Sequence, residues 1–216
     1  MEPRLYKDRK AAGLALAERL KDTGAKRPLV LAIPRGGVPV AIEIAKLLEC
    51  PFDTLVVRKI GTLFNPEFAV GAVGPHDIFL VDESWLKASH ASRAAVEAIV
   101  GNERQEMRRR AEIYKSGTQS AGYIPDMVIL VDDGIATGLT ARAAILAARE
   151  RYPKARVVFA TPLSIGDDLD LVRELADELV CLDESDDLYA ISQAYDDFPQ
   201  LTDEDVLKLL KKTIKE

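Results

Sequence analysis

Two adjacent aspartates followed by a short loop of small residues are the most chemically suggestive feature of the sequence. Asp132 and Asp133 come directly after an apolar run, and the stretch GIATGLT that follows them supplies backbone N–H groups and two threonine hydroxyls. Carboxylates accept hydrogen bonds from a vicinal diol or hold Mg²⁺ through water. Backbone amides at the N-terminus of a helix bind phosphate. An acidic pair beside such a loop therefore indicates a sugar phosphate as the ligand.

In this interpretation the sugar hydroxyls lie on the two aspartates and the 5-phosphate lies on the loop. The phosphate-binding candidates are Ile135, Ala136, Thr137, Gly138, Leu139 and Thr140. The loop is not a Walker A motif, because the spacing from Gly134 to Gly138 is too short and no lysine precedes Thr140. The alternative is a strand–helix turn whose acids only face solvent. Single aspartates at strand ends are common, whereas the whole pattern is not.

The flanking segments predict how this site is positioned. Residues 127–131 read as a buried strand, and an alanine-rich helix follows from about Leu139. Ligands of parallel sheets bind beyond the carboxyl ends of the strands, where the two acids fall. Further strands are predicted at 29–33, 52–60, 156–161 and 178–182, and helices at 6–22, 40–48 and 168–175. The expected fold is α/β, with a single doubly wound, mainly parallel sheet flanked by helices.

Residues 128–140, VILVDDGIATGLT, resemble the phosphoribosyl-pyrophosphate (PRPP) binding motif of the type I phosphoribosyltransferases. That pattern is four apolar residues, two acids, a few small residues and Thr-Gly-x-Thr, and the resemblance extends over most of residues 25–182. It implies a pentosyltransferase that moves ribose 5-phosphate from PRPP to a nitrogenous base and releases pyrophosphate, with Mg²⁺ as cofactor. Asp132 and Asp133 would be catalytic residues that bind the ribose, stabilise its cationic ring and hold Mg²⁺ through water.

The resemblance also implies where the pyrophosphate lies. Arginines and glycines that follow two neighbouring strands suit a highly charged anion. The candidates are Arg35, Gly36, Gly37, Arg58 and Lys59. In the family the first of these loops often contains a non-proline cis peptide bond, which we place at Pro34–Arg35. Arg58 would also act in catalysis by stabilising the leaving group.

Residues 61–68 contain glycine, asparagine and proline, which predicts a loop. By resemblance the segment takes the place of the flexible catalytic loop that closes over PRPP and excludes water. Glu67 is the only acid in this segment, and so the only general base that the loop itself offers.

A helical insert is expected within the core. Residues 69–73 and 77–81 read as a β-hairpin, and a helical pattern then covers about 83–117. Its basic run Arg108–Arg110 is interpreted as a solvated face, because consecutive helical positions point in different directions. We expect a homodimer, and the insert is a candidate for packing against the partner subunit.

The core is predicted to cover residues 1–182, and residues 183–216 form a C-terminal hood packed on it. In several members of the resembling family such a hood covers the acceptor base with an aromatic ring, and Tyr189 or Tyr195 could stack in this way. Alternatively, these tyrosines anchor the tail to the core. An amphipathic helix is expected at 202–212, preceded by a capping box formed by Thr202 and Asp205.

The acceptor stays open. Enzymes for 6-oxopurines usually carry Glu-Asp as the acidic pair and a further aspartate before the Thr-Gly, where this chain has Ala136. They also place a lysine after the next strand, and residues 161–164 contain none. A non-catalytic sensor of PRPP or a nucleotide is the alternative function. One half of a PRPP synthetase is discounted, since this single domain is too short for a two-domain enzyme.

Composition limits the remaining possibilities. The 35 acidic residues outnumber the 29 basic ones, which argues against a nucleic-acid partner. Cys50 and Cys181 lie far apart in apolar or strand-end contexts and are interpreted as small buried residues rather than a disulfide. No apolar run reaches membrane-spanning length, and the first residues lack the apolar core of a signal peptide. We therefore expect a cytoplasmic protein that does not associate with membranes.

Overall fold

The computed structural model describes residues 5–61, 69–81, 93–115, 120, 122–166 and 169–213. Its main layer is a five-stranded sheet in the order β2-β1-β6-β7-β8, and every neighbouring pair is parallel. The strands are β1 (Pro28–Ala32), β2 (Phe52–Thr54), β6 (Met127–Val131), β7 (Arg156–Ile165) and β8 (Glu178–Ser185). The doubly wound parallel sheet predicted from the sequence is confirmed, and β6 lies at its centre with all five residues buried.

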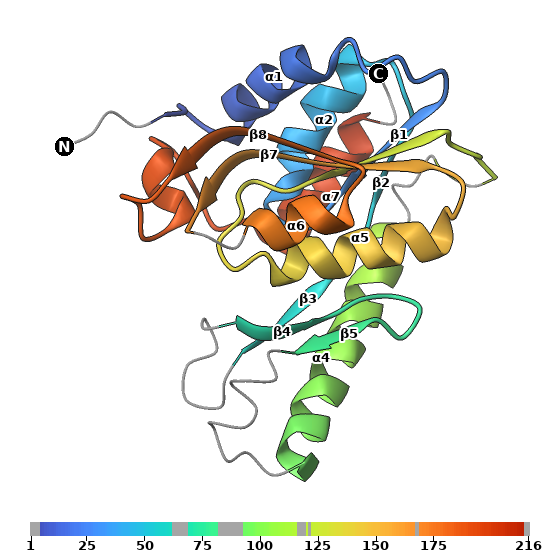
Figure 1. The fold of residues 1–216 in the computed structure, drawn as a ribbon, viewed down its shortest axis with the longest axis vertical. Coiled ribbons are helices and arrows are strands. Elements are labelled where there is room, and N and C mark those ends of the chain that lie inside the picture. The colour runs from blue at the N-terminus through green and yellow to red at the C-terminus, as the bar shows by residue number, and fades with distance from the viewer. Residues whose placement is uncertain are drawn as a thin grey trace.

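Helices cover both faces of this sheet (Figure 1). One face packs against α1 (Arg9–Leu20), α2 (Gly37–Leu47) and α7 (Asp203–Thr213). The other packs against α5 (Leu139–Arg151) and α6 (Leu169–Leu175). Successive strand residues point to opposite faces, so Ile129 and Val131 join the first core while Val128 and Leu130 join the second.

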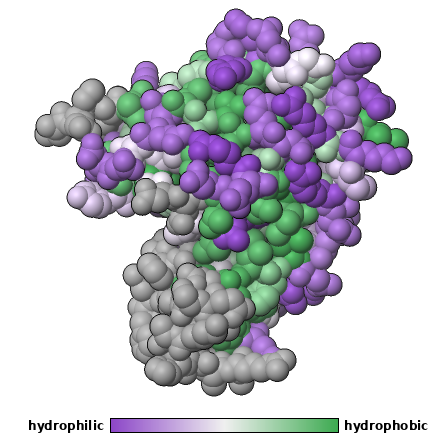
Figure 2. All heavy atoms as spheres, viewed as in Figure 1, coloured by the Kyte–Doolittle hydropathy of each residue, from purple (hydrophilic) through white to green (hydrophobic). Residues whose placement is uncertain are grey.

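A second sheet, antiparallel and three-stranded, forms a lobe beside α5 with the long helix α4 (Arg93–Tyr114) (Figure 1). Its strands are β3 (Arg58–Gly61), β4 (Ala69–Val73) and β5 (Phe79–Val81). Figure 2 shows apolar side chains gathered over this lobe and its junction with the layer above, whereas the upper surface is mostly polar. The predicted hairpin is confirmed as β4 and β5, and the predicted helical insert is described from Arg93 onward.

The strand predicted at 52–60 is wrong in one respect, because the structure divides it between two sheets. β2 ends at Thr54 and pairs with β1, whereas β3 begins at Arg58 and pairs with β4. The apolar residues between them go to different cores, Val56 to the first and Val57 to the second. The run between the two strands is apolar throughout, so its pattern carries no sign of where its pairing partner changes.

The C-terminal segment returns across the N-terminal one. β8 runs beyond the proposed core boundary at residue 182 and ends at Ser185, followed by the short 3-10 helix η2 (Ile191–Ala194). The backbone N–H of Asp196 donates to the Tyr6 carbonyl at 2.9 Å. The predicted capping box of α7 is confirmed, since the Thr202 N–H donates to the Asp205 carboxylate at 3.0 Å and the Asp205 N–H to the Thr202 hydroxyl at 3.2 Å. None of the helices among the described residues combines the length and the apolar character that crossing a membrane requires.

Candidate functional site

The acid pair follows β6 at the carboxyl edge of the sheet, as predicted, but its two members have different surroundings. Asp132 lines a cavity, and its Oδ1 accepts the backbone N–H of Asp133 at 2.9 Å. Burial and the negative charge of Asp133 raise the pKa of the Asp132 carboxyl well above its usual range. A hydrogen-bond donor or a cation in the cavity would therefore favour the charged form of Asp132.

Asp133 is held by Arg9, the first residue of α1, which the sequence did not single out. Arg9 Nε lies 2.7 Å from Asp133 Oδ2, and the two side chains are only 9% and 15% exposed. Arg9 Nη1 also donates to the Pro199 carbonyl at 2.9 Å, and its guanidinium lies 3.6 Å above the Phe198 ring. The Tyr195 hydroxyl donates to the Asp133 carbonyl at 2.7 Å. Residues from both ends of the described chain therefore fix this acid.

The phosphate loop forms the floor of the same cavity, whose volume is about 180 Å³. The cavity is lined by Lys59, Asp132, Gly134, Ile135, Ala136, Thr137, Gly138, Thr140, Ala141 and Ile191. Gly138 is the N-cap of α5 and has φ 65°, a conformation that glycine adopts without steric cost. The helix N-terminus therefore opens into the cavity.

Two of the six predicted phosphate-loop residues have more limited roles than expected. The Ile135 N–H donates to the Leu163 carbonyl at 2.9 Å, so this amide is already occupied and is not free for a phosphate. Leu139 is 8% exposed and packs in the core with α5 rather than lining the cavity. The short ladder between Ile135 and Ser164 holds the start of the loop against β7.

The glycine pair of the other predicted loop packs directly on the acid pair. A Cβ on Gly36 would overlap the Asp133 carboxylate, and one on Gly37 would overlap the Val131 carbonyl. The cis peptide bond expected at Pro34–Arg35 is present. The sequence PRGG thus brings the backbone that follows Arg35 against the acid pair, because only glycine permits so close an approach.

The two bases of β3 were expected to face the same group, and the structure separates them. Lys59 lines the phosphate cavity. Arg58 points toward α4, where its Nε and Nη2 each lie 2.8 Å from Glu103 Oε2. Adjacent residues of a strand point to opposite faces, so a pair of neighbouring cations on β3 cannot serve one phosphate group equally.

The tyrosines proposed to stack on an acceptor do not occupy the cavity. Tyr195 is 1% exposed and packs between Tyr6 and Phe198, so its ring has no open face and this assignment is wrong. Tyr189 is 90% exposed and does not line the cavity. Ile191 of η2 does, and a Cβ on Gly134 would overlap its side chain. Glu67, the proposed loop base, lies outside the described residues.

In the described part of the chain, protein side chains alone do not form a site for a metal ion. No group of three or more His, Cys, Asp or Glu residues there is arranged to hold a metal ion. One carboxylate, Asp132, lines the cavity. This donor set fits an ion such as Mg²⁺, which typically binds one or two carboxylates and completes its octahedral shell with water and substrate phosphates.

Comparison with known proteins gives the family. A family model described as "Phosphoribosyl transferase domain" matches residues 6–198. The chain is 40% identical over 207 residues to "Putative phosphoribosyl transferase Rv0571c" of Mycobacterium tuberculosis (strain ATCC 25618 / H37Rv), and the match covers 96% of this chain and 46% of that protein. A protein of strain CDC 1551, "Putative phosphoribosyl transferase MT0597", matches to the same extent, so the chain spans about half the length of these curated relatives.

A solved structure covers nearly the whole chain. The protein TT1426 from Thermus thermophilus is 38% identical with a TM-score of 0.76, and the match covers 96% of this chain and 98% of that one. The family model spans both the acid pair and the phosphate loop. The chain therefore belongs to the phosphoribosyl transferase family.

Proposed function

We propose that the protein transfers the ribose 5-phosphate group of PRPP to a nitrogenous acceptor and releases pyrophosphate. One observation carries the proposal. A partly buried acid pair, a helix N-terminus opening into a cavity and a glycine loop with an arginine meet at the carboxyl edge of β1 and β6. Each of these parts suits a different portion of PRPP.

The 5-phosphate would lie on the free amides of Ala136–Thr140, with the Thr137 and Thr140 hydroxyls as further donors and Lys59 as a counter-charge. The ribose diol would donate to Asp132, whose pKa is raised by burial and by the charge of Asp133. The pyrophosphate would extend toward Arg35 and Arg58, away from the phosphate loop.

Breaking the bond between ribose C1 and pyrophosphate creates positive charge on the ring and negative charge on the leaving group. Asp132, which lines the cavity, would stabilise the ring, and the arginines would stabilise the leaving group. Arg9 would keep the Asp133 carboxylate aimed at the glycine loop. Asp132 would hold Mg²⁺ through water, and the ion would supply additional positive charge.

The wall that an acceptor would meet is apolar. Ile191 covers Gly134, and the polar side chains of the neighbouring strand end are already buried: Thr161 donates to the Leu163 carbonyl at 3.1 Å and Ser164 is 2% exposed. An acceptor would therefore be selected by the shape of its ring against Ile191 more than by hydrogen bonds to β7. This supports a flat heterocycle with its polar edge directed away from the hood.

Turnover of PRPP with a panel of purine, pyrimidine and pyridine bases tests the proposal, with released pyrophosphate as the readout. We expect pyrophosphate release with at least one base, and Asp132→Asn should abolish it while inorganic phosphate still binds to the loop. PRPP binding without release for any base would instead support a PRPP sensor. Absence of PRPP binding to the wild-type protein would refute both functions.

A further inference from the structure

The basic run of α4 is only in part the solvated face expected from the sequence. Arg108 is exposed and the Arg109 side chain is 47% exposed, but the Arg110 side chain is only 13% exposed. Each residue of a helix is rotated by about 100° from the previous one, so the three arginines face different surroundings. Arg110 is the less exposed of the two that reach α7, whereas the more exposed Arg109 places its Nη2 2.6 Å from Asp203 Oδ2.

Arg110 approaches the same carboxylate as the arginine of the glycine loop. Its Nε lies 2.7 Å from Glu106 Oε1 and 4.0 Å from Asp203 Oδ1. Arg35 Nη1 lies 3.9 Å from that same Asp203 oxygen. The Tyr114 hydroxyl also donates to it, at 2.7 Å. Asp203, at the start of α7, therefore lies within ion-pair range of an arginine of α4 and of the arginine of the glycine loop through one oxygen atom.

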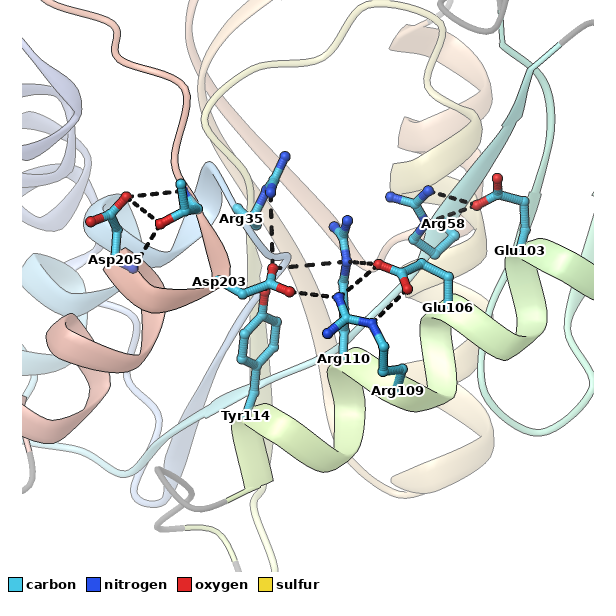
Figure 3. A network of polar contacts seen from close by, with 10 residues as sticks. Arg35, Arg58, Glu103, Glu106, Arg109, Arg110, Tyr114, Asp203 and Asp205 are labelled. Atoms are coloured by element: carbon cyan, nitrogen blue, oxygen red, sulfur yellow. Dashed lines mark hydrogen bonds and ion pairs between the residues drawn. The ribbon is translucent and has the colours of Figure 1, made fainter.

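Arg58 extends this arrangement by one helical turn. Its partner Glu103 precedes Glu106 by three positions on α4, a spacing that places both on one face of the helix. In Figure 3 the guanidinium of Arg110 is drawn between those of Arg35 and Arg58, and its outer nitrogens point away from the carboxylate of Glu106. Arg110 contacts both Glu106 and Asp203 through Nε, the inner nitrogen.

The carboxylates behind the arginines remain charged. Hydrogen bonds from Arg109, above all, lower the pKa of Glu106 to about 2, and Tyr114 and Arg109 lower the pKa of Asp203 although burial opposes them. Ionised partners reduce the repulsion among guanidiniums that must sit close together. They also fix the direction of each guanidinium while leaving an outer edge for another anion, the fork geometry that suits phosphate oxygens.

We propose that Arg110 is a third binding residue for the pyrophosphate group of PRPP, acting beside Arg35 and Arg58. The inference rests on the proposed function for the identity of the ligand. It assigns the helical insert a part in the site, because α4 supplies Arg110 directly and orients Arg58 through Glu103. A diphosphate has oxygens enough to accept from three guanidiniums at once, whereas a single phosphate does not extend across them.

Titration calorimetry with inorganic pyrophosphate, PRPP and ribose 5-phosphate tests the assignment. Arg110→Gln should weaken pyrophosphate and PRPP binding by roughly tenfold to a hundredfold, the usual range for a lost charge-assisted hydrogen bond. Ribose 5-phosphate binding should stay unchanged. Arg108→Gln is the matched control, because it removes the same charge from the same helix at an exposed position, and we expect little change for all three ligands.

Glu106→Gln separates a ligand role from a structural one. It removes the carboxylate that orients Arg110 but keeps the arginine and its charge, so pyrophosphate affinity should fall less than in Arg110→Gln. The proposal is overturned if Arg110→Gln binds pyrophosphate as tightly as the wild type does. It is also overturned if Arg108→Gln or Glu106→Gln loses as much pyrophosphate affinity as Arg110→Gln. If the wild-type protein binds pyrophosphate through Arg110 but not PRPP, the anion site stands and the proposed function fails. If it binds PRPP but Arg110→Gln does not matter, only the assignment of Arg110 fails.

Discussion

Replacement of Arg9 by glutamine is the most direct test of how the acid pair is built. The change removes the guanidinium that pairs with Asp133, and both side chains are almost fully buried, at 9% and 15% exposed. Breaking a buried ion pair on one side costs about 3–5 kcal/mol, because the remaining charge is left without compensation. Loss of the contacts with Pro199 and Phe198 adds to this cost, although such terms are not additive.

For a chain of this length each kcal/mol lowers the melting temperature by about 2–4 °C. Arg9→Gln should therefore lower it by roughly 6–20 °C, measured by scanning calorimetry near neutral pH. Lys10→Gln is the matched control, since Lys10 is the next residue of α1 and is exposed. We expect it to shift the melting temperature by about 2 °C or less, as is usual for an exposed site.

A double-mutant cycle with Asp133→Asn identifies the interaction itself. When both partners are neutral, no unpaired buried charge remains, so the double variant should be less destabilised than the sum of the two single variants. If Arg9→Gln and Lys10→Gln have the same melting temperature, or if the cycle is strictly additive, the view that Arg9 fixes the acid pair is refuted.

Further predictions concern other parts of the molecule. Gly37→Ala should cost about 1–3 kcal/mol through overpacking, since its Cβ would overlap a backbone carbonyl of β6, and PRPP affinity should fall with it. Gly101→Ala, a helical site with nothing within 4 Å of the added Cβ, should instead stabilise the protein slightly in the same thermal assay. The pKa of Glu106 is lowered from 4.5 to about 2 in the folded protein, so the stability that this carboxylate contributes is present above pH 4.5 and is lost as the pH falls toward 2. When the pH is lowered from about 6 to about 3, the urea midpoint of Glu106→Gln should therefore fall less than that of the wild type. Burial raises the pKa of both free thiols, Cys50 and Cys181, to about 11, so alkylation at neutral pH should be slow until urea unfolds the chain; fast labelling of the native protein would contradict this.

The parts of the site that depend on local sequence were predictable. Strand β6 has the predicted bounds, and the glycine that begins α5 follows from the pattern of small residues in the loop. The glycine pair at Gly36 and Gly37 was also recognisable, because a close backbone approach requires residues without side chains. Such features are encoded within short stretches of consecutive residues.

Contacts between distant segments could not be predicted in this way. Arg9 and Asp133 are 124 residues apart, and nothing near Arg9 marks it as the partner of an acid. The helical pattern of α4 showed three arginines but not which of them reach Asp203, since that depends on where α7 lies. The same reason explains why a tyrosine was chosen for the hood where the structure places Ile191. Sequence alone does not say how a tail folds back on its core.

The contacts between residues 6–9 and 194–199 have a consequence for how the protein is made. Tyr6 exchanges backbone hydrogen bonds with Ala194 and Asp196, and Arg9 binds the Pro199 carbonyl while it holds Asp133. A ribosome releases the first of these segments long before the second, because synthesis proceeds from the N-terminus. The acid pair therefore cannot reach its final arrangement until residue 199 has been added. A nascent chain that stops after β8 would have all five strands of the main sheet but an incomplete site, so ligand binding should begin only after residue 199 has been added.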